Sequence, residues 1–112
     1  MTPVIEEVGE KVHIIEQKYF AEDQQRHMAG EITRSSESAL RIKGYVWVRD
    51  QVKGFVRKNA KRERIVYPGD RTTITLIPKE VDINDIKYVS SEGTLMVTDG
   101  KGFTLDITES SR

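Results

Sequence analysis

Apolar and polar residues alternate along much of the chain, a pattern typical of β-strands that bury one face. The alternation is clearest in residues 40–49. One parity there contains Leu40, Ile42, Gly44, Val46 and Val48, and the other contains Arg41, Lys43, Tyr45, Trp47 and Arg49. Because neighbouring side chains of a strand point to opposite faces, this pattern predicts a strand with one apolar face and one face of cations and aromatic rings.

Shorter runs of the same kind predict further strands on both sides of this one. The predicted strands cover residues 11–16, 26–34, 39–49, 55–58, 62–67, 71–77, 95–97 and 103–107. Polar turn sequences lie at residues 35–38, 68–70 and 99–102. The strands on either side of 35–38 and of 99–102 are expected to pair as antiparallel hairpins. Residues 19–25 fit either a helical turn or a polar loop.

Two local signals modify this pattern. Gly44 lies in the middle of the longest strand, where a glycine often marks a bulge or a bend, and bent strands of this kind are common in small barrels. The alternative is that a bulky partner packs against the bare backbone at this position. Residues 81–87 fit a short helix or 3₁₀ turn, with Asp82 as its N-cap.

The fold class predicted from these elements is all-β. We expect a small single-domain antiparallel barrel or sandwich of OB or SH3-like size, with at most one short helix or 3₁₀ turn near residues 82–87. A chain of 112 residues fits one domain. Within it we expect a loose acidic segment at residues 1–10, the β-domain at 11–109 and a polar tail at 110–112.

Charge divides the chain into three parts, although the formal net charge is zero. Residues 1–40 have a net charge of −4, residues 41–71 of +7 and residues 72–112 of −3. A basic central part can bind an anionic partner. It can equally pair with the acidic ends of its own chain or of a neighbouring copy.

No motif for catalysis, a cofactor or a metal is present in the sequence. There is no cysteine, and there is no nucleophile elbow or phosphate-binding loop. His13 and His27 are the only histidines, and neither has the spacing of a zinc motif. A metal held by one of them together with Glu31 is a possibility that the pattern does not favour. We therefore expect no enzyme activity, no cofactor and no metal site.

The cationic and aromatic parity of residues 40–49 is the feature that suggests a function. β-Sheet faces bind single-stranded nucleic acids by stacking bases on aromatic rings and by placing cations near phosphates. Tyr45 and Trp47 are two residues apart, about 7 Å along a strand, and the next strand would bring further cations close if it folds back. The candidate residues for binding nucleic acid or another polyanion are Arg41, Lys43, Tyr45, Trp47, Arg49, Arg57, Lys58, Arg62 and Arg64.

Two other interpretations of the same face remain open. Tyr45 and Trp47 could form a second core against the N-terminal segment, with the stems of Arg and Lys packed past them. The face could also be the interface of a homo-oligomer or of a complex with a protein partner, since Trp, Tyr and Arg are enriched at interfaces. An enzyme is the class of protein that the sequence favours least.

The expected location follows from what the sequence lacks. No apolar run is long enough to span a bilayer. The first residues contain no basic segment followed by an apolar stretch, which a secretory signal would have. Together with the absence of cysteine, these observations predict a cytoplasmic protein without a membrane partner.

Overall fold

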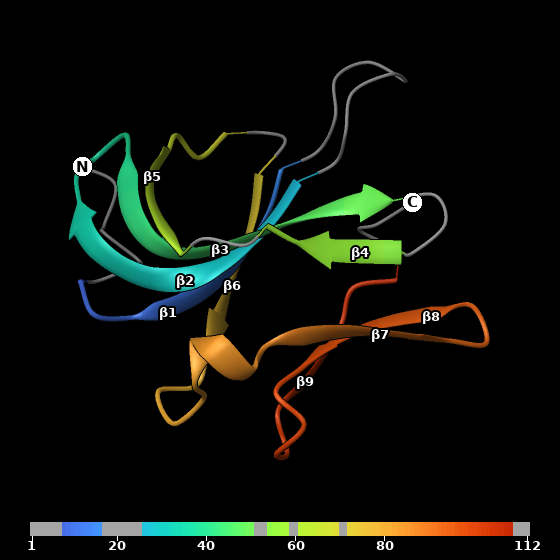
Figure 1. The fold of residues 1–112 in the computed structure, drawn as a ribbon. Helices are drawn as coiled ribbons and strands as arrows, with labels where there is room; N and C mark the ends of the chain where they lie inside the picture. Colours follow the sequence, from blue (N-terminus) through green and yellow to red (C-terminus); the bar gives the residue numbers. More distant parts are fainter. Residues whose placement is uncertain (1–7, 17–25, 51–53, 59–60, 70–71, 109–112) are drawn as a thin grey trace.

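The computed structural model describes residues 8–16, 26–50, 54–58, 61–69 and 72–108 (Figure 1). Apart from one 3₁₀ turn, the regular structure of these residues consists of β-strands in two antiparallel sheets. The predicted all-β class is therefore confirmed. The arrangement agrees with the sandwich alternative, because the described strands do not close into a barrel. The predictions for residues 1–7, 19–25 and 110–112 lie outside the described residues.

The larger sheet has the strand order β4–β3–β2–β1–β6, and β5 also pairs with β3. Its strands are β1 (Lys11–Glu16), β2 (Arg26–Ser35), β3 (Leu40–Asp50), β4 (Gly54–Arg57), β5 (Arg62–Val66) and β6 (Thr72–Ile77). The first half of β3 pairs with β5 and the second half with β4. Figure 1 shows β2 and β3 curving strongly along their length.

The predicted hairpin between β2 and β3 is confirmed. Ile32 lies opposite Ile42, and the register then shifts by one residue, so that Arg34 lies opposite Arg41. The shift is a β-bulge in which Thr33 is the extra residue of β2. The bulge therefore changes the face of the sheet on which the last residues of β2 lie.

The close approach of β2 requires a glycine at the centre of β3. Gly44 lies directly opposite Gly30. A Cβ atom on Gly44 would lie 2.1 Å from the carbonyl oxygen of Ala29 and 2.5 Å from Cα of Gly30. These are backbone atoms that cannot rotate away, so no side chain fits here. Figure 1 shows that β3 is curved, as a bent strand was expected to be, and the neighbour at the bare backbone of Gly44 is a second glycine rather than a bulky side chain.

One hydrophobic cluster fills the concave side of the larger sheet. It consists of Val12, Ile14, Met28, Ile32, Leu40, Ile42, Val46 and Val66. The apolar parity of β3 contributes Leu40, Ile42 and Val46 to this cluster, as the alternation predicts. Burial of these side chains, at roughly 25 cal/mol per Å² of apolar surface, favours the curved form of the sheet.

The second sheet is formed by the C-terminal part of the chain. A 3₁₀ turn, η1 (Ile83–Asp85), precedes the strands β7 (Lys87–Ser91), β8 (Thr94–Thr98) and β9 (Thr104–Asp106), which pair in the order β7–β8–β9. The predicted 3₁₀ turn and its cap are confirmed, since the side chain of Asp82 accepts a hydrogen bond from the backbone N–H of Asn84. The predicted hairpin of β8 and β9 is confirmed as well.

The sequence pattern does not predict strand β7. This strand pairs with β8 through a tight turn at Glu92 and Gly93, and both turn residues have positive φ. Two central residues with positive φ are typical of the type I′ hairpin turn, in which Asn or Asp usually takes the first position. Because Glu is unusual at the first position of such a turn, the sequence does not indicate a turn at residues 92 and 93.

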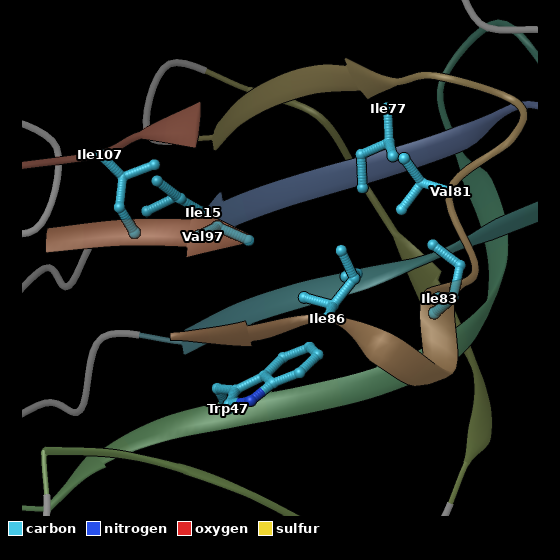
Figure 2. Close-up of a cluster of buried hydrophobic side chains, with 9 residues drawn as sticks. Ile15, Trp47, Ile77, Val81, Ile83, Ile86, Val97 and Ile107 are labelled. Atoms are coloured by element: carbon cyan, nitrogen blue, oxygen red, sulfur yellow. The ribbon is translucent and has the colours of Figure 1, made fainter. Parts of the chain in front are cut away.

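A second hydrophobic cluster joins the two sheets (Figure 2). It contains Ile15, Ala29, Trp47, Ile77, Val81, Ile83, Ile86, Val97 and Ile107. Figure 2 shows Trp47 on β3 pointing into this cluster beside Ile86. The C-terminal sheet therefore covers the face of the larger sheet that lies opposite its concave side.

Candidate polyanion-binding surface

Trp47, the only tryptophan of the chain, belongs to the core between the two sheets. The residue is 3% exposed, and its ring centroid lies 5.3 Å from that of Tyr88 on β7. Its ring is therefore not available to stack on a base. For Trp47, the structure agrees with the interpretation in which this residue forms part of a second core. The cover that the structure describes is the C-terminal sheet, and not the N-terminal segment that the sequence suggested.

Tyr45 is half-buried, and both its hydroxyl and its ring have partners. The hydroxyl donates a hydrogen bond to Oδ1 of Asn84, at 2.6 Å. Cζ of Arg57 lies 4.4 Å from the centroid of the tyrosine ring, a cation–π contact. The edge of the ring packs against Trp47, with 6.3 Å between the centroids. A base would have to displace Arg57 to stack on Tyr45.

Arg41 and Lys43 lie on the face of β3 that carries Tyr45, as the alternation predicts, but acidic residues lie beside them. Lys43 is opposite Glu31 on one side and opposite Glu63 on the other. Nε of Arg41 lies 3.2 Å from Oε1 of Glu63. The two carboxylates reduce the excess positive charge on this part of the face.

The arginines of β5 lie on the opposite face from Lys43. Arg62 is opposite Gly44, and Arg64 is opposite Ile42. Because directly opposite residues share a face and Ile42 belongs to the concave cluster, both arginines are on the concave side, at the edge of the sheet. Strand β5 thus brings cations close to β3, as expected, but divides them between two faces.

The unbalanced positive charge is concentrated on and between β4 and β5. We define the β4–β5 cation group as Arg57, Lys58, Lys61, Arg62 and Arg64. Arg64 is half-buried and the other four are exposed. Among the residues that the structure describes, no carboxylate oxygen lies within 4.0 Å of a cationic nitrogen of this group. The side chain of Arg49, the remaining candidate, lies outside the described part.

A polar hollow of about 210 Å³ lies next to this group. It is lined by Lys11, Glu31, Lys43, Lys61, Asp82 and Ile83. Nζ of Lys11 donates to the backbone carbonyl oxygens of Lys79 and Val81, which fixes this ammonium group. Lys43 and Lys61 make no such bond to the described residues. The hollow therefore extends the β4–β5 cation group toward Lys43, although its two carboxylates offset part of the charge.

A buried cluster of two histidines and a tyrosine links the sheets. His13 on β1 and His27 on β2 are both 0% exposed. The Tyr88 hydroxyl lies 2.7 Å from Nε2 of His13 and 2.8 Å from Nδ1 of His27. Since a hydroxyl both donates and accepts, it can bond to both rings at once. We call these residues the His–Tyr–His cluster.

Burial keeps the groups of this cluster uncharged. It lowers the pKa of His13 to about 4. Burial, and to a smaller degree the neighbouring His13, lowers the pKa of His27 to about 3. Burial also raises the pKa of the Tyr88 hydroxyl. The cluster thus joins the two sheets through uncharged polar groups, and both imidazole rings are inaccessible to solvent.

The cluster does not resemble a metal site. Among the described residues, no group of three or more His, Cys, Asp or Glu side chains is placed to hold a metal ion. Glu31 lines the polar hollow instead. Sequence reasoning missed the cluster because its three members are far apart in the chain. The alternation of β2 gave the one available indication. As expected, it places His27 on the face of the strand opposite that of Met28.

No family model matches the chain, and no match was found among the curated proteins or among the solved structures. No helix among the described residues has the length and apolar character that crossing a membrane requires. The fold and its surface define a two-sheet all-β domain with a cationic edge at β4 and β5.

Proposed function

We propose that the protein is a non-catalytic β-domain of the cytoplasm that binds polyanions, including nucleic acids, through the β4–β5 cation group. One observation supports this proposal above all. The five cations lie on or beside neighbouring strands, exposed or half-buried, and no described carboxylate neutralises them. The phosphates of a polyanion would supply the missing negative charge.

The group lies on both faces of the sheet, at the edge that β4 and β5 form. Arg57 is opposite Trp47 and Arg62 is opposite Gly44, about 10 Å apart along β3 and on opposite faces. A polyanion that passes over this edge could place phosphates near both arginines. With Trp47 buried and the Tyr45 ring covered by Arg57, contacts to phosphates would dominate over base stacking. Binding is therefore expected to be insensitive to base sequence and strongly dependent on salt.

Neutralising the two arginines of β5 tests this proposal. We expect the wild-type protein to bind a mixed-sequence single-stranded oligonucleotide and heparin at low salt, with an affinity that falls steeply as salt rises. The double variant Arg62→Gln with Arg64→Gln is expected to bind more weakly. Its log–log salt slope should be smaller by about 1 for each phosphate contact removed. Fluorescence anisotropy of a labelled oligonucleotide over a salt series measures both quantities.

A matched control removes two charges elsewhere. Lys79 and Lys87 are exposed cations outside the β4–β5 cation group. The double variant Lys79→Gln with Lys87→Gln should keep the wild-type salt slope. No binding at low salt, or an equal loss in this control, would contradict the proposed function.

Assembly is the second candidate function, and the strands β5 and β6 of the larger sheet favour it, because each pairs with one described strand only. β5 and β6 follow one another in the chain, yet no ladder between described residues joins them. Open edges can accept another strand, and Leu76 on β6 is 50% exposed.

If a second copy pairs along β6, the mass in solution should rise with protein concentration. The variant Leu76→Lys should then stay monomeric, because a charge on an edge strand opposes pairing. Light scattering over a concentration series measures this. A monomeric mass at high concentration would exclude the homo-oligomer.

A further inference from the structure

A hollow of about 190 Å³ lies at the closed end of the β2–β3 hairpin, beside β5. Its lining includes Arg34, Ser35, Ala39, Leu40, Arg41 and Ile65. It is smaller than the roughly 300–1,000 Å³ of pockets that hold drug-sized ligands. The hollow therefore suits a small molecule, and its lining indicates which kind.

Two arginines form one part of this lining. Arg34 and Arg41 lie directly opposite each other on β2 and β3, and like charges in such a pair repel. The bulge at Thr33 creates the pair, because in an unshifted register Thr33 would lie opposite Arg41, and Arg34 would lie opposite Leu40 on the concave side. Arg41 contacts Glu63, whereas Arg34 has no acidic partner within 4.0 Å among the described residues. An anion between the two guanidinium groups would relieve the repulsion.

Apolar side chains form the other part of the lining. Ile65 lies opposite Arg41 on β5 and is 53% exposed, which is unusual for an isoleucine inside a strand. The half-buried Ala39 adds apolar surface next to it, whereas the side chain of Leu40 is buried in the concave cluster. The buried Oγ of Ser35 has no hydrogen-bond partner among the described residues, so one further polar atom of this lining is unsatisfied.

We infer that this hollow binds a small monocarboxylate with a short aliphatic chain. The carboxylate lies between the guanidinium groups of Arg34 and Arg41, whose planar donor pattern matches its two oxygens. The aliphatic chain covers Ile65 and Ala39 and removes their exposed apolar surface from water. This site does not depend on the proposed polyanion function, because its ligand needs an apolar contact that a phosphate chain does not supply.

Hexanoate is the probe that tests this inference. In a ¹H–¹⁵N titration, hexanoate should cause saturable shifts at the backbone amides of Arg34, Ser35, Arg41 and Ile65. For so small a ligand, a dissociation constant in the millimolar range is expected. Hexanamide lacks the charge and inorganic phosphate lacks the chain. Each should bind at least about tenfold more weakly, because each loses one of the two kinds of contact.

Two variants separate the charge from the apolar wall. Arg34→Gln removes the arginine without an acidic partner, and Ile65→Thr removes apolar surface but keeps a β-branched side chain. Both residues are exposed, so the fold should survive, and each variant should weaken hexanoate binding by about tenfold. Lys79→Gln, outside the hollow, should leave it unchanged. The inference fails if hexanoate causes no saturable shift, if hexanamide binds as tightly, or if Arg34→Gln binds like the wild type.

Discussion

Acidification from pH 6.5 to pH 4 should lower the free energy of unfolding by about 3 kcal/mol through His13 alone, at about 1.36 kcal/mol per pKa unit. Burial between the sheets favours the neutral imidazole, so the unfolded chain binds a proton more readily than the folded one. Stability therefore increases with pH across this window. The contribution of His13 to stability is fully present above pH 6.5 and is lost as the pH falls to about 4.

His27 acts in the same direction over a wider window. The pKa of its imidazole is lowered to about 3, so its contribution is lost between pH 6.5 and about 3. Since a domain is typically stable by about 5–15 kcal/mol, the two histidines together can unfold the protein in mild acid. Protonation would also turn the ring nitrogen that accepts from the Tyr88 hydroxyl into a donor, so the hydrogen bonds that hold β7 to the larger sheet would have to rearrange.

Chemical denaturation at a series of pH values measures this effect. The histidine window can be separated from that of the carboxylates. Hydrogen bonds lower the pKa of Asp82, Asp99 and Asp106 below 3.8, so their contributions are lost mainly at more acidic pH. The imidazole signals of His13 and His27 in NMR spectra should remain those of neutral rings at pH 5.5, about one unit below the usual pKa. A free energy of unfolding that stays constant between pH 6.5 and pH 5 would contradict this account.

Replacement of Trp47 by alanine should lower the free energy of unfolding by about 3–5 kcal/mol. The indole is 3% exposed and lies in the cluster that holds the two sheets together, where it contacts the rings of Tyr45 and Tyr88. Its loss leaves a cavity that the facing strands cannot fill without moving. Urea denaturation, followed by circular dichroism because the variant has no tryptophan, gives the value.

Tyr67 supplies the matched control. It is 69% exposed, so Tyr67→Ala should change stability by less than about 0.5 kcal/mol. In the wild-type protein the fluorescence of Trp47 should be that of a buried indole and should not be quenched by an oligonucleotide, even where anisotropy shows binding. Quenching, or a Trp47→Ala variant as stable as the Tyr67→Ala variant, would mean that this face is open in solution.

Most of the fold could be predicted from alternation and turn chemistry, which act over short stretches of chain. The long strand β3, its hairpin with β2 and the capped turn at Asp82 all follow from local preferences. Strand β7 does not, because an unusual residue, Glu92, occupies its turn. Because strand β7 was not predicted, its residue Tyr88 could not be predicted as the partner of Trp47.

The candidate site was less predictable than the fold. It depends on the register in which β5 pairs with β3, and on which face of β3 the C-terminal sheet covers. Alternation correctly placed Lys43 and Tyr45 on one face of β3. It could not show that β5 pairs with β3 in a register that sends Arg62 and Arg64 to the other face. Nor could it show that a later sheet buries Trp47. Both outcomes depend on contacts between residues that are far apart in the chain.

The link between the two sheets determines how the protein opens. Among the described residues, backbone hydrogen bonds run within each sheet and none crosses from one sheet to the other. Among the contacts of the described residues, those that hold β7–β9 against the larger sheet are made by side chains, in the hydrophobic cluster and in the His–Tyr–His cluster. The C-terminal sheet can therefore detach as one cooperative unit while every ladder of the larger sheet stays intact. Amide exchange should accordingly follow two tiers, with the amides of β3, which is hydrogen-bonded on both sides, among the last to exchange.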